Sequence, residues 1–474
     1  MTISLRLPKA LMVELHEHLF PGDSDEHGAV IAASVISTER GMRLLAHRVF
    51  IARDGVDYVN GQRGYKMLTA TFVMDAALEC ASLGMAYLAV HCHRGKNQVS
   101  FSSDDMASHE RGYPALLDIL DGQPVGALVL AENAIAGDIW FANGERRNLE
   151  ETIVTGRPLE YYYDSPSKKS KQIDERFDRQ ARLFGDRGQL LLKTQKVGVI
   201  GAGGAGSLVV EYLTRLGVGE VVIIDPDRIE PSNLPRVVGS KLKDTLPWIT
   251  DERIPVVIRS KLLRFRKPKV KIAARQAKGI GVPSKITPLI LNVSDKIAVR
   301  SLKDCDYLFL AADSMQARLI FNALVHQYLI AGVQMGAKAQ VDKKTGSIVD
   351  LFVVVRPLIP GVGCLWCNGL ILPSRLQEEA TSSEQIKKQR YIEEDNIRAP
   401  SVITLNAVGA AGATNDYLMT TTGLLEYQDV TWQKIYPRKG TTTFERVRKD
   451  ITCGECTFVG RLGKGDTKSL PIKQ

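Results

Sequence analysis

The chain has 474 residues, of which 44% are hydrophobic and 24% charged, and its formal net charge is +9. This length is too great for one ordinary core, and the composition is that of a folded chain, which excludes a disordered or collagen-like protein. No apolar run approaches the roughly 18 residues that a membrane-crossing helix needs. The first twenty residues carry acidic side chains and lack a cleavable apolar core, so we expect a cytoplasmic protein.

Three parts follow one another along the chain. Residues 1–155 alternate short β-like runs with one clear helix, TFVMDAALECASLG. Residues 156–173 are polar, basic and contain Pro158 and Pro166, which predicts a linker. Residues 174–474 continue as an α/β pattern to the carboxyl end. The predicted fold class is therefore α/β throughout, in two domains.

A metal-ligand pattern closes the strand-like run MAYLAV. The run ends in His91-Cys92-His93, and Ser102-x-x-Asp105 follows after a short loop. Two histidines two residues apart at a strand end point the same way and can share one ion with a later aspartate. Three protein ligands leave a fourth position for water, the arrangement of a catalytic zinc site. Asp104 is the alternative ligand.

This pattern resembles the JAMM or JAB metalloprotease family, which cleaves bonds after the C-terminal glycine of ubiquitin-like proteins. The resemblance implies that a glutamate acts as general acid/base and that Ser102 assists the oxyanion. Glu26 in DEHGAVIAAS matches the family's glutamate, and Glu39 is the alternative. A domain that binds a ubiquitin-like tail without cleaving it is the other interpretation.

The segment from Lys196 to Arg236 predicts a nucleotide-binding βαβ unit. An apolar run leads into Gly201-x-Gly203-x-x-Gly206, a helical pattern follows, and a second apolar run ends on Asp225. Glycines let the backbone turn tightly and approach a phosphate, and an aspartate at this place accepts from a ribose hydroxyl. The fingerprint alone indicates NAD binding.

The residues that follow Asp225 are more specific. Asp227 and the run Ser232-Asn233-Leu234-Pro235-Arg236 resemble the ATP-binding core of the ThiF/MoeB and ubiquitin-activating superfamily. The resemblance implies a Rossmann-like domain that adenylates the C-terminal carboxylate of a ubiquitin-like protein. It implies nucleotide binding by Gly201, Gly203, Gly206, Asp225, Asp227 and Asn233.

The phosphates of ATP require cations, and Arg236 and Lys269 are the candidates. Relatives have a lysine in a glycine-containing stretch that opens a helix, and RKPKVKIAARQA supplies Lys269 without the glycine. Lys267 and Lys271 are the alternatives. In ERFDRQARLFG, Arg179 resembles the arginine that reaches the ATP of the other subunit, which implies a homodimer; a surface salt bridge is its ordinary alternative role.

A magnesium ligand is predicted after the strand-like run DYLFLAA. Asp313 ends this run, and a carboxylate at the carboxyl end of a parallel strand points into the ligand crevice. The segment resembles the family's Asp-x-x-x-x-Arg motif, so we expect Asp313 to bind Mg²⁺ with support from Arg318 and Asn322. A helix N-cap is the alternative role for Asp313.

Four of the seven cysteines fall into the pairs Cys364-x-x-Cys367 and Cys453-x-x-Cys456. This spacing predicts a tetrahedral, structural Zn²⁺ site that clips the carboxyl-terminal tail onto the α/β domain; four free thiols are the alternative. Related MoeB- and ThiF-type enzymes carry the same arrangement, which extends the resemblance over about 174–460.

The acyl acceptor after adenylation is open. Ubiquitin-activating relatives place a nucleophilic cysteine near the crossover loop, but the stretch from Ser374 to Asn406 contains none. The acyl group therefore stays as the adenylate, passes directly to a partner's nucleophile, or passes to a serine. The candidate serines are Ser382, Ser383 and Ser401, although Ser401 could simply cap a helix.

Two basic stretches remain, at 165–172 and from Arg259 to Lys278. The second overlaps an apparent insertion between Arg236 and Lys267, since relatives pass more directly from the asparagine-arginine motif to the next helix. A solvated face is the ordinary explanation for such charge, and an acidic protein partner or ATP phosphates are the others; no motif indicates nucleic acid.

Together these patterns predict a bifunctional enzyme that uses ATP, Mg²⁺ and Zn²⁺ and acts on the tail of one ubiquitin-like protein, by adenylation and by zinc-dependent processing or deconjugation. A conjugating enzyme is a further expected partner. The alternative interpretations are activation and processing of a sulfur carrier in cofactor or metabolite biosynthesis, and a scaffold without catalysis.

Overall fold

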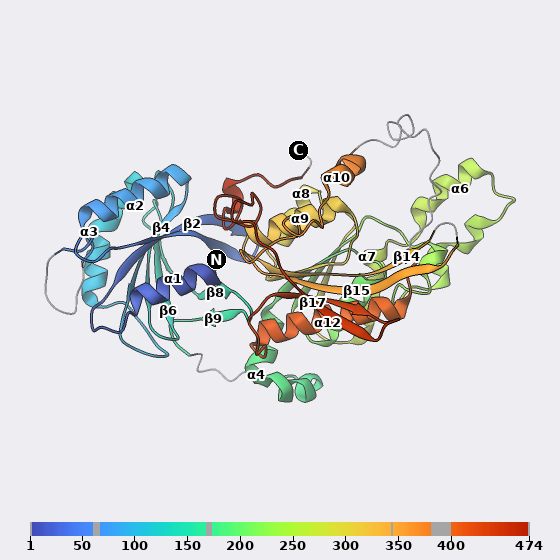
Figure 1. Cartoon of the computed structure of the whole chain (residues 1–474), viewed down its shortest axis with the longest axis horizontal. Helices are drawn as coiled ribbons and strands as arrows, with labels where there is room; N and C mark the ends of the chain where they lie inside the picture. Colours follow the sequence, from blue (N-terminus) through green and yellow to red (C-terminus); the bar gives the residue numbers. More distant parts are fainter. Residues whose placement is uncertain (1, 60–66, 167–172, 343–344, 381–399, 473–474) are drawn as a thin grey trace. The chain divides into compact units, whose positions relative to one another are not determined.

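The computed structural model describes residues 2–59, 67–166, 173–342, 345–380 and 400–472, and the chain forms two compact α/β units (Figure 1). The first unit contains Met1–Lys171, His326–Leu329 and Ile451–Ser469; the second contains Gln172–Val325, Ile330–Asp450 and Leu470–Gln474. None of the helices in the described ranges is both long enough and apolar enough to cross a membrane.

The first unit is built on a nine-stranded mixed sheet with the order β7-β6-β5-β4-β2-β3-β1-β8-β9. Its elements are β1 (Thr2–Pro8), α1 (Lys9–Leu19), β2 (Gly28–Thr38), β3 (Gly41–Ile51), α2 (Ala70–Leu83), β4 (Ala86–Cys92), α3 (Ser103–Ile119), β5 (Val125–Leu130), β6 (Ile135–Trp140), β7 (Arg146–Asn148), β8 (Glu151–Thr155) and β9 (Glu160–Tyr162). Strand β9 lies within residues 156–173, the predicted linker.

Helices cover both faces of this sheet (Figure 1). Successive side chains of a strand point to opposite faces, and the buried residues divide accordingly. Ile31 and Leu88 pack with α1, whereas Val30 and Tyr87 pack with α2 and α3. Because both faces are buried, the central strands are almost continuously apolar.

Distant segments of the chain meet where β2 begins and β4 ends. Strands β2 and β4 are antiparallel, and Gly28 at the start of β2 is paired with His91 near the end of β4. The segment that precedes β2 therefore lies beside the end of β4, and α3 begins after the loop that leaves β4. The carboxyl-terminal segment also packs on β2 and β3: Ser34 Oγ donates to Gly463 O, and His47 Nδ1 lies 2.7 Å from Leu462 O.

The second unit has an eight-stranded sheet with the order β12-β11-β10-β13-β14-β15-β16-β17. Its elements are α4 (Asp178–Thr194), β10 (Lys196–Ile200), α5 (Gly204–Arg215), β11 (Glu220–Ile224), α6 (Val256–Leu262), α7 (Lys269–Ile280), β12 (Lys285–Leu289), α8 (Lys296–Lys303), β13 (Tyr307–Leu310), α9 (Met315–Gln327), β14 (Ala331–Val341), β15 (Ile348–Leu358), α10 (Pro373–Ala380), α12 (Ile403–Thr422), β16 (Thr431–Tyr436) and β17 (Thr441–Arg446).

The first five strands of that order are parallel, and the last three are antiparallel additions. The chain reverses direction across the sheet between β10 and β13, which is the place where open α/β sheets bind ligands at the carboxyl ends of their strands. The predicted Rossmann-like arrangement is confirmed. Helix α12 packs against α5 and against β14 and β15.

Candidate functional site

The glycine-rich loop joins β10 to α5 at this reversal point. Gly201 has a φ of +100°, which favours glycine, and a Cβ on Gly206 would lie 1.9 Å from Gly201 O. The strand and helix therefore approach more closely than any side chain permits. Gly203, which precedes α5, faces open space. The loop is tight where it meets the fold and open where a phosphate would approach.

Asp225 ties this loop to the end of β11. Its Oδ2 accepts from Ala202 N and its Oδ1 from Asp227 N, each at 2.7 Å. Burial raises the pKa of Asp225 above its usual value, although the charge of Lys269 and the two amide donors oppose this. Each carboxylate oxygen keeps a second acceptor position, so the side chain can hold the loop and also accept from a ribose hydroxyl.

Lys269 is the lysine that contacts the turn after β11. Its Nζ is 2.7 Å from Asp227 Oδ2, and its backbone N donates to Asp227 O. The alternatives Lys267 and Lys271 are exposed. Lys269 opens α7, as the sequence predicts for a lysine at the start of a helix.

The asparagine-arginine motif forms a short turn beside the glycine loop. Asn233 is buried, its Oδ1 accepts from Glu230 N, and its carbonyl accepts from Arg236 N. Arg236 is half-buried, and its carbonyl lies close to Gly204. Asn233 shapes the turn that carries Arg236 to the site.

Asp313 is exposed three residues beyond the end of β13. It does not cap α9, because Ser314 Oγ accepts from Ala317 N and the Glu379 carboxylate accepts from Met315 N and Gln316 N. The alternative N-cap role is thus filled by other residues, and the carboxylate of Asp313 is left at the strand end for a ligand.

The two residues expected to support Asp313 differ in their environments. Burial lowers the pKa of Arg318, an effect that the negative charge of Asp313 partly offsets, and Arg318 Nη1 donates to Leu370 O. Asn322 is fully buried, and its Oδ1 accepts from Leu365 N. Asn322 therefore orders the loop that carries Cys364 and Cys367 rather than the ligand crevice.

Two residues join the site without any sequence signal that marked them. A Cβ on Gly204 would lie 2.3 Å from Asn406 Nδ2, so α12 is packed directly on the glycine loop. Asn406 Nδ2 also donates to Ser401 Oγ. Glu379 of α10 is the second missed residue. Ser382 and Ser383 lie outside the described residues, and Arg179 is exposed on α4.

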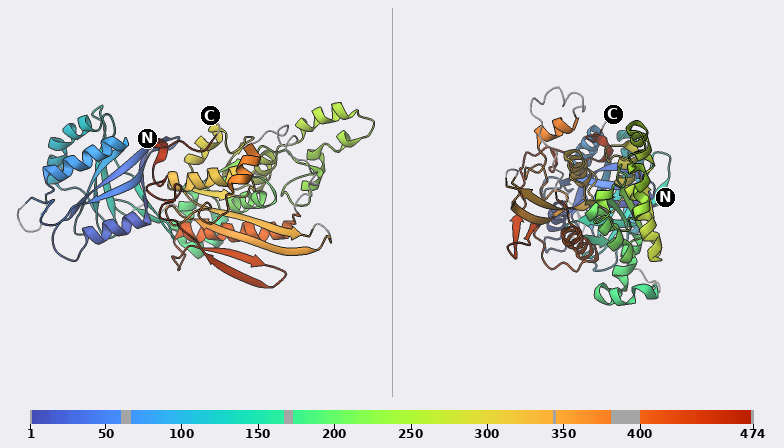
Figure 2. Two further views of the ribbon diagram at one scale, coloured as in Figure 1. Left: turned by 45° about the horizontal axis from the view of Figure 1, so that its top comes forward. Right: turned by 90° about the vertical axis from the view of Figure 1, so that its right-hand side faces the viewer.

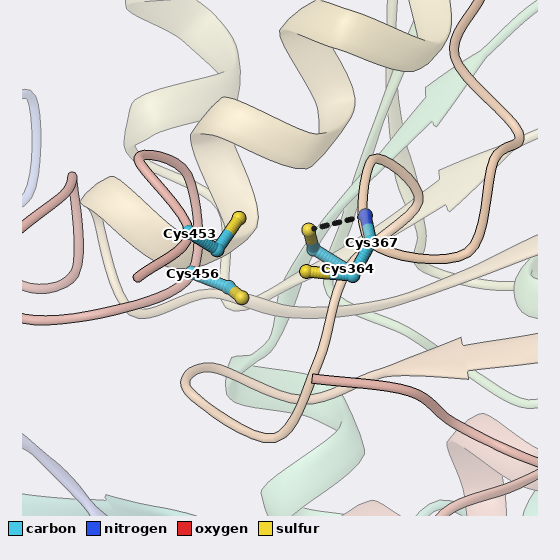
Figure 3. Close-up of side chains that lie close together, drawn as sticks. All are labelled: Cys364, Cys367, Cys453 and Cys456. Atoms are coloured by element: carbon cyan, nitrogen blue, oxygen red, sulfur yellow. Dashed lines mark hydrogen bonds between the residues drawn. The ribbon is translucent and has the colours of Figure 1, made fainter. Parts of the chain in front are cut away.

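The four predicted zinc cysteines form one cluster (Figure 3). The Sγ atoms of Cys364, Cys367, Cys453 and Cys456 all lie within 4.8 Å of one another. Backbone amides point at the sulfurs: Cys367 N donates to Cys364 Sγ at 3.3 Å, and Glu455 N donates to Cys453 Sγ at 3.4 Å. Four thiols with amide donors fit a tetrathiolate zinc site and leave no position for a substrate.

A second cluster of potential metal ligands lies at the end of β4 in the first unit. His91 Nε2 and His93 Nε2 are 3.2 Å apart, and each is 3.4 Å from a carboxylate oxygen of Asp105. His93 Nδ1 lies 3.1 Å from Ser100 O, which directs Nε2 toward the cluster. Among the described residues Asp105, rather than Asp104, completes this possible metal group.

The hydrogen bonds within the cluster favour the charged forms of Asp105 and His93. Burial raises the pKa of Asp105, but hydrogen bonds from His91 and His93 outweigh it and hold the pKa far below the usual range. The hydrogen bond with Asp105 raises the pKa of His93. Three convergent donors of this chemistry fit a divalent ion with an open fourth position.

Glu26 and Ser102 flank this cluster differently. Glu26 Oε1 lies 4.0 Å from His93 Nε2, whereas Glu39 follows the far end of β2. Ser102 Oγ donates to Asp105 Oδ2 at 2.7 Å and accepts from Asp105 N, a capping box that begins α3. In this arrangement the serine orients Asp105.

Known proteins resemble the second half of the chain. The ThiF family model matches residues 177–370. The chain is 30% identical over 193 residues to the sulfur carrier protein ThiS adenylyltransferase of Bacillus subtilis, covering 40% of this chain and 50% of that protein. It is 28% identical over 155 residues to a sulfur carrier protein adenylyltransferase of Thermus thermophilus, covering 32% and 50%. It is also 28% identical over 138 residues to the SAMP-activating enzyme E1 of Haloferax volcanii, covering 29% and 44%.

The chain spans half or less of the length of these relatives. The family match begins at residue 177, so it gives the JAMM-like interpretation of residues 1–155 no support. It does cover the glycine loop, Asp225, Arg236, Lys269 and Asp313, which lie at or beside the carboxyl ends of the parallel strands β10, β11 and β13. Residues 177–370 therefore form a ThiF-like domain.

Proposed function

We propose that the ThiF-like domain adenylates the C-terminal carboxylate of a ubiquitin-like sulfur carrier protein. The observation that carries the proposal is the grouping of the glycine loop, Asp225 and Asp313 at the carboxyl ends of neighbouring parallel strands. Lys269, at the start of α7, joins this group through its ion pair with Asp227. The names of the Bacillus and Thermus relatives support a sulfur carrier as the substrate class.

The reaction needs positioned charge rather than a covalent enzyme intermediate. A carboxylate oxygen of the carrier attacks the α-phosphorus of ATP, the bond to the β-phosphate bridging oxygen breaks, and pyrophosphate leaves with that oxygen. Lys269 and Arg236 would neutralise the phosphates, the backbone at Gly203, where an added Cβ would meet no atom within 4 Å, would face them, and Asp225 would hold the ribose. Arg179 would act on the nucleotide of a partner subunit in a homodimer.

The residues present fit magnesium. Asp313 offers an exposed carboxylate, the hard oxygen ligand that Mg²⁺ prefers, just beyond the carboxyl end of the parallel strand β13. When bound, the ion supplies charge neutralisation at the phosphates. Asp313 would hold it, and Arg318 would remain fixed by Leu370 O.

A sulfur carrier also fits the lack of any cysteine in the sequence between Ser374 and Asn406. Cys305 is fully buried, and Ser401 Oγ already accepts from Asn406. We therefore propose that this domain releases the acyl adenylate as its product and that a nucleophile of a partner protein reacts with it. Detection of a thiocarboxylate would support sulfur transfer, whereas a protein conjugate would support the ubiquitin-like modification pathway.

ATP–pyrophosphate exchange tests the proposal. Purified ThiS carrier of Bacillus subtilis and SAMP of Haloferax volcanii are the probes. Carrier-dependent exchange should fall at least about a hundredfold in Asp313→Ala, because a charge partner of the transition state is lost. The unfolding temperature should not change, since Asp313 is exposed and does not cap α9. Absence of exchange with both carriers would reject the proposal and favour a scaffold.

For the first unit we propose zinc-dependent hydrolysis of a peptide or isopeptide bond at the tail of the same carrier. The convergence of His91, His93 and Asp105, with Glu26 beside them, favours it. When bound, zinc supplies Lewis-acid activation of water. Glu26 would accept and return a proton, and Ser102 would keep Asp105 in place.

Two substitutions separate metal binding from proton transfer. His93→Ala should lose both bound zinc and hydrolysis of a carrier with a C-terminal extension. Glu26→Gln should retain zinc and lose hydrolysis, because the amide cannot accept the proton. Full hydrolysis by Glu26→Gln would exclude this role of Glu26.

A further inference from the structure

The segment between Arg236 and Lys267, which the sequence predicts to be an insertion and which is called the insertion below, exposes apolar side chains that proteins ordinarily bury. Val256, Val257 and Ile258 of α6 are 74%, 68% and 50% exposed, and no residue of α6 is buried. Trp248 and Phe265 on either side are 56% and 60% exposed. An exposed apolar grouping of this kind marks an interaction surface.

The same segment is strongly basic. Residues 241–267 contain eight lysines and arginines against three acidic residues. Asp244 pairs with Arg275 outside the segment, and Asp251 pairs with Arg253 within it. The surface therefore combines apolar area with net positive charge and fits an acidic partner.

Helix α6 lacks the features that stabilise a helix alone. It has seven residues, begins with three consecutive β-branched side chains and lies away from the sheet of its unit in Figure 1 and in the left view of Figure 2. Isolated helices of this length are marginal in water, and β-branched residues are weak helix formers. A partner that covers the apolar residues would supply the missing packing.

The base of the insertion is the rim of the nucleotide site. Arg228 Nη1 donates to Arg266 O at 2.7 Å, and Ile229 N donates to Lys267 O at 2.9 Å. Lys269, two residues further on, forms the ion pair with Asp227. A protein bound to the insertion would thus lie next to the place where a carboxyl tail must enter.

We propose that residues 241–267 bind the folded body of the carrier protein whose tail is adenylated, through a carrier face that is acidic around an apolar centre. This inference rests on the proposed adenylation. A membrane fits less well, because Arg259, Ser260 and Lys261 interrupt the apolar residues around α6 instead of forming a separate polar face. A second copy fits less well because two identical basic patches repel each other.

The test separates the body of the carrier from its tail. The double variant Val257→Asp/Ile258→Asp and the single variant Lys261→Glu would be compared with wild type in the exchange assay. Each would be given intact ThiS carrier or a short synthetic peptide with its C-terminal sequence. Val13→Asp, an equivalent change at an exposed residue of α1, is the control. Direct binding of ThiS would be measured in parallel by calorimetry.

The insertion variants should raise the KM for intact ThiS at least about tenfold, with the KM for ATP and exchange with the peptide unchanged. An unchanged KM for ThiS would overturn the docking proposal and leave adenylation standing. Binding of ThiS that the variants abolish, without exchange in wild type, would support docking and reject the proposed function.

Other occupants would show themselves in the same proteins. No binding of ThiS to wild type would overturn the proposal. The proposal would also be overturned if the variants kept their affinity for ThiS but no longer sedimented with phosphatidylglycerol vesicles. The same holds if they kept that affinity but no longer self-associated in analytical ultracentrifugation.

Discussion

Asp225 holds the glycine loop and, in the proposed function, would also bind the ligand. Its two oxygens hold Ala202 N and Asp227 N, so the glycine loop and the turn after β11 share one anchor. The geometry of the loop that we propose to bind phosphate is thus fixed by contacts within the protein. Preorganised amides stabilise charge without rearranging during the reaction.

The glycines of the loop should respond differently to the same substitution. Gly206→Ala places a Cβ 1.9 Å from Gly201 O, so we expect a lower unfolding temperature and no nucleotide binding. Gly203→Ala meets no atom within 4 Å, so we expect a folded protein whose affinity for ATP is reduced. Thermal unfolding with and without ATP measures both effects. Equal destabilisation by the two alanines would contradict this description of the loop.

Residues with local patterns were predictable, and residues brought in by tertiary packing were not. Gly201, Asp225 and Asp313 each follow an apolar run at a recognisable spacing, so the sequence places them at strand ends. Asn406 and Glu379 reach the site from helices far along the chain, and nothing in their neighbourhoods distinguishes them from ordinary polar residues. Long-range packing decides such positions, and no local pattern contains it.

At the scale of elements, the segment 241–267 is anchored at both ends, and α6 between them has no buried residue. Asp244 accepts from both terminal nitrogens of Arg275, at 2.8 and 2.7 Å, and from Lys241 N. These contacts fasten the start of the insertion to α7, while α6 extends beyond them. The sequence predicted an insertion here but not its helices, because the Val-Val-Ile start of α6 is a strand-like pattern.

The Asp244–Arg275 pair should make stability depend on pH. The hydrogen bond from Arg275 lowers the pKa of Asp244, so the carboxylate stabilises the folded state above its unfolded pKa of about 4 and loses this effect as the pH falls. At pH 7, Asp244→Asn should lower the free energy of unfolding by about 2 kcal/mol. Denaturant titrations at a series of pH values would show the difference shrink below pH ~4. A difference that is constant with pH would argue against the ion pair.

For the whole molecule, we expect the two metal-ligand clusters to contribute differently to the stability of the fold. The cysteine cluster joins two sequence pairs that are far apart, so a metal held there closes a long stretch of chain and adds its binding energy to folding. The histidine cluster lies on a sheet and helix that have their own apolar cores. Cluster membership was predictable from ligand spacing, whereas the choice of Asp105 over Asp104 required the start of α3.

Metal analysis should therefore find two zinc ions per chain, one for each cluster. Cys456→Ser should lose one ion and lower the unfolding temperature, because three thiolates hold zinc less tightly and the chain closure is weakened. His93→Ala should lose the other ion with a smaller change in unfolding temperature. Elemental analysis beside thermal unfolding measures both, and a wild-type protein without zinc would contradict the assignment.

The capping box at the start of α3 uses the same carboxylate, that of Asp105, that we propose as a metal ligand. Asp105 Oδ2 accepts from the backbone N and from the hydroxyl of Ser102, so the turn that starts the helix also fixes the carboxylate between His91 and His93. Any opening of that turn withdraws the carboxylate. A bound ion would consequently slow hydrogen exchange of the first α3 amides, and Ser102→Ala would speed both that exchange and the release of the ion.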